Sequence, residues 1–104
     1  MLKGGARRCL NSGTKASMLT IHKFKIEIND ALQGVNVRDG AKFLTAAMQG
    51  GDLCLWFEHD TEKPVMTREF RVFGTGHQIQ GFQKREWRAT VLAKPFVWHV
   101  YEVL

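Results

Sequence analysis

The chain of 104 residues has no long apolar run and few cysteines or prolines. No stretch approaches the roughly 20 apolar residues that a membrane-spanning helix needs, so membrane-spanning helices are excluded and no membrane partner is expected. Two cysteines, Cys9 and Cys54, cannot build a disulfide scaffold, and a cytoplasmic location is therefore expected. Glycine does not recur at a fixed interval, and 11% of the residues are aromatic and need burial. These two features exclude collagen-like, coiled-coil and wholly disordered chains. A single compact domain remains.

Acidic side chains are missing from residues 1–17, which carry four of the fifteen basic ones. From Met18 onward eleven basic side chains accompany ten acidic ones, so this part of the chain is nearly neutral. The composition of residues 1–17 cannot repay the entropy of ordering, and a disordered basic leader is expected. It comes from an upstream start codon or an added segment, or it is a basic arm with weak, nonspecific affinity for nucleic acid. Residues 18–104 are expected to form one β domain.

Side chains after Met18 alternate with a period of two, which is typical of half-buried strands. In the first strand, residues 21–28, the side chains of Phe24, Ile26 and Ile28 are expected to share the inward face. Similar runs predict strands at residues 35–37, 53–59, 66–73, 86–93 and 96–103, with Pro95 in the last turn. Residues 42–49 are ambiguous, because alanine, leucine and methionine favour a helix, but their length and the flanking glycines favour a strand, which is expected here. The almost continuous apolar character of residues 53–59 predicts a central strand that is covered on both faces.

This pattern predicts a mainly β fold, either a small antiparallel sandwich or a partly open barrel of six or seven strands. At most one short helix is expected, near residues 29–34 or 78–85. In the strand at residues 66–73, Met66, Phe70 and Val72 are expected to point inward.

Residue types that carry catalysis are scattered along the chain. Cys54 stands between two leucines, as a small core residue does, and Ser12 and Ser17 lie in the leader without a nucleophile-elbow pattern. The histidines lack the spacing of zinc ligands, so neither a metal nor another cofactor is expected: His22, His59, His77 and His99. A binding protein is therefore expected; an enzyme would have to use His77 or His99 as its acid or base.

The segment Gly74-Thr75-Gly76-His77 is the most specific local pattern. Two glycines allow a sharp turn whose successive N–H groups can hold an anion. One interpretation is a bulge or corner where a strand bends. The other is a phosphate-contacting loop, whose ligand would also meet the remaining candidate residues: Arg68, Arg71, Arg88 and Trp98.

The strand at residues 96–101 has large side chains on both faces. Phe96, Trp98 and Val100 share one face, and Val97, His99 and Tyr101 share the other. We expect one face to meet the core and the other to meet a partner subunit, a second sheet or a ligand. A homo-oligomer formed through this strand is therefore predicted.

Three segments carry a family resemblance: LCLW at residues 53–56, FRVFGTGH at 70–77 and FVWHVYE at 96–102. Together they resemble a family of small uncharacterised tailed-phage and prophage proteins, over about residues 21–103 of this chain. The family has no assigned function and offers no catalytic or binding residues to carry over. The resemblance implies a phage accessory protein in the host cytoplasm. Small accessory phage proteins often counter host immunity by binding a host protein or by sequestering a nucleotide signal.

Three functions follow as hypotheses. The leading one is a non-enzymatic anti-defence factor that sequesters a nucleotide-derived immune signal between aromatic faces and arginines. The second is an interaction module that meets a host defence protein or phage protein through an exposed strand or an apolar sheet face. The third is a small-barrel nucleic-acid binder that uses four basic side chains: Lys23, Lys25, Arg85 and Arg88.

Overall fold

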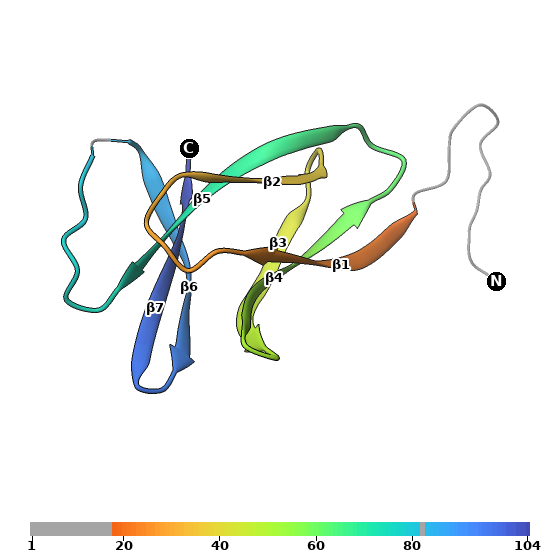
Figure 1. The fold of residues 1–104 in the computed structure, drawn as a ribbon. Helices are drawn as coiled ribbons and strands as arrows, with labels where there is room; N and C mark the ends of the chain where they lie inside the picture. The colour runs from red at the N-terminus through yellow and green to blue at the C-terminus, as the bar shows by residue number, and fades with distance from the viewer. Residues whose placement is uncertain (1–17, 82) are drawn as a thin grey trace, which may run out of the picture.

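The computed structural model describes residues 18–81 and 83–104, so the prediction for residues 1–17 lies outside the described residues. The segments whose side chains alternate between apolar and polar form strands, and all of the strand pairs are antiparallel (Figure 1). In chain order they are β1 (Leu19–Ile26), β2 (Gln33–Arg38), β3 (Lys42–Gln49), β4 (Asp52–Asp60), β5 (Val65–Gly74), β6 (Arg85–Ala93) and β7 (Phe96–Val103).

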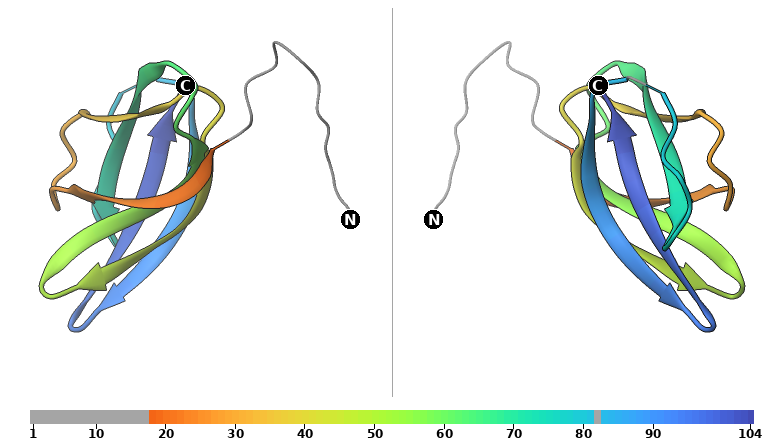
Figure 2. Two further views of the ribbon diagram at one scale, coloured as in Figure 1. Left: turned by 90° about the vertical axis from the view of Figure 1, so that its right-hand side faces the viewer. Right: turned by 90° about the vertical axis from the view of Figure 1, so that its left-hand side faces the viewer.

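The strands form two sheets, one in the order β1-β4-β3 and the other in the order β2-β5-β7-β6. The sheets face each other as the layers of a sandwich rather than closing into a barrel, so the mainly β prediction is confirmed (Figure 2). Within residues 18–81 and 83–104 no helix forms, and hence none that could cross a bilayer. The β3–β4 and β6–β7 hairpins end at the same end of the molecule (Figure 2).

Strand β4 is central in its sheet and is the most buried strand, as its apolar sequence predicts. Its residue Phe57 is fully buried, and its ring meets those of Phe24, Phe43 and Phe70 edge to face at centroid distances of 5.7, 5.5 and 6.1 Å. Edge-to-face contacts suit the ring quadrupole and add to the hydrophobic effect. This aromatic cluster joins the two sheets at the centre of the core.

The turn between β3 and β4 depends on two glycines. Gly50 and Gly51 have φ of 57° and 88°, a region that suits a tight two-residue hairpin and that other residues rarely adopt. Such a turn fixes the register, so that Met48 pairs with Leu53 and the inward faces of both strands coincide.

Two inward-facing predictions need correction or refinement. Ile28 was expected on the inward face of the first strand, but β1 ends at Ile26 and Ile28 is exposed. The reason is that the chain leaves the three-stranded sheet after Ile26 and crosses to β2 in the other sheet. Phe70 and Val72 are buried as predicted, whereas Met66, near the start of β5, is 42% exposed.

Candidate functional site

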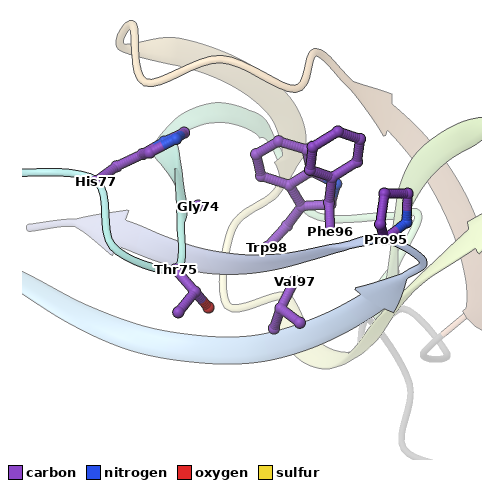
Figure 3. A pocket seen from close by; sticks show the side chains of 7 residues that line it. All are labelled: Gly74, Thr75, His77, Pro95, Phe96, Val97 and Trp98. Atoms are coloured by element: carbon purple, nitrogen blue, oxygen red, sulfur yellow. The ribbon is translucent and has the colours of Figure 1, made fainter.

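A pocket of about 290 Å³ lies where the end of β5 meets the β6–β7 hairpin (Figure 3). It brings together four of the eight residues that the sequence singled out: Gly74, Thr75, His77 and Trp98. The remaining lining comes from the hairpin turn and the first residues of β7: Pro95, Phe96 and Val97. Gly76 belongs to the same turn, whereas the three candidate arginines do not line the pocket.

Aromatic rings form the main wall of the pocket. Phe96 stacks on Trp98 with centroids 5.3 Å apart and an interplanar angle of 26°, and the His77 ring lies 6.4 Å from Trp98. These three side chains lie on one side of β7, while Thr75 and Val97 point to its other side (Figure 3). The Phe96 and Trp98 rings are nearly parallel and the His77 ring is tilted against them, so the wall is a largely apolar surface that suits a ring or an apolar side chain.

Gly74 is required by this packing. It pairs with Trp98 across β5 and β7, and a Cβ at Gly74 would lie 2.8 Å from His77 Cε1 and 3.0 Å from Trp98 Cζ3. Glycine thus lets both rings lie directly over the backbone.

Replacing Gly74 with alanine is expected to push the His77 ring off the Trp98 ring and to cost about 1–3 kcal/mol through overcrowding. The Trp98 indole N–H and His77 ring resonances should both move in a heteronuclear NMR spectrum. Resonances that stay in place would show that the rings do not depend on the missing side chain.

Two backbone N–H groups of the Gly74–His77 turn are already hydrogen-bonded within the fold. The Thr75 amide donates to the Val97 carbonyl at 3.1 Å, and the His77 amide donates to the Gly74 carbonyl at 3.0 Å. These N–H groups are therefore engaged with backbone carbonyls. An anion bound here would have to displace those bonds.

Arg68 and Arg88 form a buried ion-pair cluster with Glu102 on β7. Arg68 Nε and Nη2 donate to the two oxygens of Glu102 at 2.7 and 2.8 Å, and Arg88 Nε donates to Oε1 at 2.9 Å. Arg68 also donates to the Ala41 carbonyl and lies over the Phe57 ring. Arg88 reaches the carboxylate because a bulge in β6 between Trp87 and Ala89 adds one residue there.

The charge on Glu102 depends on this cluster. Burial by itself would raise the pKa of the Glu102 carboxyl, but the hydrogen bonds and charges of Arg68 and Arg88 hold it below its ordinary value. Two guanidinium groups are thereby committed to one carboxylate inside the sandwich. Both arginines hold the fold together at this point.

Arg71 lies on the opposite face of β5 and anchors the loop that follows. Its Nε donates to the Asp30 carbonyl at 2.7 Å, and its Nη1 donates to the Gln80 carbonyl at 2.8 Å. The guanidinium also covers the Phe73 ring at 4.8 Å, and Phe73 is buried. Arg71 therefore ties the β1–β2 and β5–β6 connections to the sheet.

The outer face of β6 and β7 carries a chain of satisfied polar groups. Trp87 Nε1 donates to Thr90 Oγ1 at 3.0 Å, Thr90 Oγ1 lies 3.0 Å from His99 Nδ1, and His99 Nε2 lies 2.8 Å from Thr75 Oγ1. Next to this chain, Leu92 pairs with Val97 across the hairpin. The face thus combines apolar side chains with polar groups that bond to one another.

Sequence reasoning missed two clusters, the one around Glu102 and a contact between His22 and His59. Glu102 alternates with Val100 and Trp98, so its position on the inward face was readable from the sequence. No sequence signal brings His22 and His59 together, because β1 and β4 are distant in the chain. In the described part of the chain no three His, Cys, Asp or Glu side chains gather as a metal site would require, and Cys54 is buried with a free thiol.

Comparison with known protein families gives a match for this chain. No curated protein and no solved structure matches the chain. A family model described as "Domain of unknown function (DUF7352)" matches residues 18–104, which is most of the sequence. The chain belongs to this family of domains of unknown function.

Proposed function

We propose that this protein is a non-enzymatic binding module that docks a partner protein through its β6–β7 hairpin. The observation that carries the proposal is the exposure of large apolar side chains on both faces of one hairpin. Leu92 is 74% exposed on the outer face, and Phe96 is 57% exposed on the inner face beside the pocket. The hairpin ends at the edge of the molecule, where a partner can contact both faces (Figure 1). The hairpin therefore presents exposed apolar surface on each of its two faces, as interaction surfaces do.

The polar groups of the hairpin favour docking as well. Thr90 and His99 hydrogen-bond to each other and to Thr75 and Trp87, so covering them does not leave a buried polar group without a partner. Trp87 is itself exposed, and tryptophan is enriched among residues that dominate binding energy. Desolvating this face therefore costs little.

The resemblance to phage and prophage proteins suggests the kind of partner. We infer a phage accessory protein whose partner is a host protein, with an anti-defence role as the working interpretation. A partner surface that fits the hairpin would offer an apolar recess for Phe96 and Trp98.

The proposal predicts that Leu92→Asp and Phe96→Asp each weaken partner binding at least about thirtyfold, as loss of a central apolar contact does. Leu92 has most of its surface in solvent, so Leu92→Asp should change the free energy of unfolding little, whereas Phe96→Asp also removes the stacking on Trp98 and should cost about 0.5–1.5 kcal/mol. Val65→Asp is the matched control, because Val65 is also 57% exposed but lies at the far end of β5 from the pocket. Calorimetric titration of a purified partner measures the effect. Equal weakening by Val65→Asp would contradict the proposal.

Sequestration of a nucleotide-derived signal is the second candidate, and one observation favours it. The Gly74–His77 turn and Trp98 converge on one pocket with an aromatic wall that could stack a base. Stacking contributes only about 1–3 kcal/mol per base, whereas nanomolar binding needs about 12 kcal/mol. The arginines that would supply the rest through phosphate contacts bond within the fold.

Calorimetric titration with cyclic nucleotides and ADP-ribose-type compounds separates the two candidates. The protein-docking proposal predicts no binding in the nanomolar range. Nanomolar binding that Trp98→Ala abolishes would support sequestration instead.

A further inference from the structure

His22 and His59 form a contact where the two sheets meet, away from the pocket. His59 Nε2 of β4 lies 2.9 Å from His22 Nδ1 of β1, and the two rings meet edge to face. On its other side, His59 Nδ1 accepts a hydrogen bond from the Arg38 amide of β2 at 3.4 Å. His59 is buried, whereas His22 is exposed. His59 thus connects the three-stranded sheet to an edge strand of the four-stranded sheet.

The hydrogen-bond pattern determines where the protons are. Because the Arg38 amide is a donor, His59 Nδ1 must be the unprotonated nitrogen, and Nε2 carries the proton of the neutral ring. His59 Nε2 therefore donates to His22 Nδ1, which is the acceptor. The contact is complete only when both rings are neutral.

Adding one proton to this pair breaks a bond in every arrangement. A proton on His22 Nδ1 places two N–H donors against each other, unless His59 moves its own proton to Nδ1. A proton on His59 Nδ1 faces the N–H of Arg38, whether it comes from solvent or moves there from His59 Nε2. The arrangements that keep the bond between the two histidines are charge-assisted, and the bond to Arg38 is the longer one at 3.4 Å, so we expect the Arg38 bond to be the one that is lost.

The charged groups beside His59 are equal in number for the two signs. Three cations and three anions come from Arg38, which bonds to His59, and from the residues that line the hollow next to His59: Arg38, Asp39, Lys42, Glu58, Asp60 and Lys63. Burial lowers the pKa of His59, and the neighbouring His22 and Arg38 lower it further. The contact therefore stabilises the fold above the ordinary histidine pKa of 6.5 and loses that contribution as the pH falls.

We propose that the His22–His59 pair is a proton-sensitive connection between the two sheets, in which uptake of one proton releases the Arg38 amide of β2 from β4. Acidification would then loosen one edge of the sandwich while the core stays folded. The pocket and the β6–β7 hairpin lie elsewhere, so this inference is independent of the proposed function.

Amide hydrogen exchange followed by NMR tests the connection in the wild-type chain. The protection factor of the Arg38 amide is expected to fall as His59 takes up its proton below pH 6.5, whereas that of the Val100 amide in the core stays unchanged. Ring nitrogen shifts of His59 report that proton uptake in the same samples. An Arg38 protection factor that does not change while the His59 ring takes up its proton would overturn the proposal, and so would an equal fall at Val100.

The variant His59→Asn provides the matched test. Asparagine Oδ1 stands at the place of His59 Nδ1, so it can accept the Arg38 hydrogen bond, and asparagine does not titrate. Arg38 protection in this variant should not depend on pH between 7.5 and 5.0. A pH-dependent loss equal to that of the wild type would show that His59 is not the sensitive group.

Discussion

Replacing Glu102 with glutamine is expected to lower the free energy of unfolding by about 3–5 kcal/mol, the typical cost of removing one partner of a buried ion pair. Glutamine keeps the shape of the side chain but leaves the guanidinium groups of Arg68 and Arg88 inside the sandwich without an anion between them. Urea denaturation at pH 7 measures the loss. Because small domains have about 5–15 kcal/mol of stability, the variant should be close to unfolding.

Glu86→Gln is the matched control for this prediction. Glu86 also pairs with Arg88, but its side chain is 57% exposed, against 7% for Glu102. Exposed pairs contribute about 0–1 kcal/mol, so Glu86→Gln should change stability little. Similar losses in the two variants would mean that burial of the Glu102 carboxylate is not what makes its ion pairs important.

The pH dependence of stability gives a second test of the same ion pairs. The pKa of Glu102 is lower in the folded chain than its ordinary value of 4.5, so its contribution is present above that pH. It is lost as the pH falls below 4.5 and the folded carboxyl takes up a proton. Urea denaturation between pH 6 and pH 3 should show a smaller acid-induced loss in Glu102→Gln than in the wild type.

Replacing Phe57 with alanine is expected to remove about 3–5 kcal/mol of stability. The Phe57 ring is fully buried and meets three other phenylalanine rings and the Arg68 guanidinium, so its loss opens a cavity between the sheets. Thermal and urea denaturation both report the change.

Leu92→Ala serves as the control for Phe57→Ala. Leu92 is a large apolar residue with most of its surface in solvent, so its truncation should cost about 0.5 kcal/mol or less. A comparable loss for Leu92 would mean that the β6–β7 hairpin is packed in the fold and is not a free surface.

The strands were predictable because each has an alternating or continuously apolar pattern that local sequence determines. Residues 42–49, where alanine and methionine favour a helix, still form β3, because flanking glycines limit the segment and β4 pairs with it. The short helix allowed near residues 29–34 or 78–85 does not occur in the described part of the chain. The choice between sandwich and barrel was not predictable, because it depends on which edge strands pair and not on any one strand.

The candidate site was predictable in part. Gly74, His77 and Trp98 gather because Gly74 pairs with Trp98 across two strands and its turn returns His77 over the same place. Arg68 and Arg71 were grouped in one site although they are three residues apart on a strand and so lie on opposite faces. Alternation alone places Arg68 on the inward face with Phe70, and in the fold Phe70 pairs with Glu102 of β7. Which carboxylate it meets depends on strand order, and this is a property of the whole fold.

Site-specific photocrosslinking in the cells from which the sequence derives tests the central claim most directly. Benzoylphenylalanine is placed at one position at a time, in place of Leu92, Phe96 or Val65, which are all exposed apolar residues. The account predicts that positions 92 and 96 yield one adduct of the same mass and that position 65 does not yield it. No adduct from the hairpin positions, or the same adduct from position 65, would contradict the claim that the β6–β7 hairpin is the docking surface.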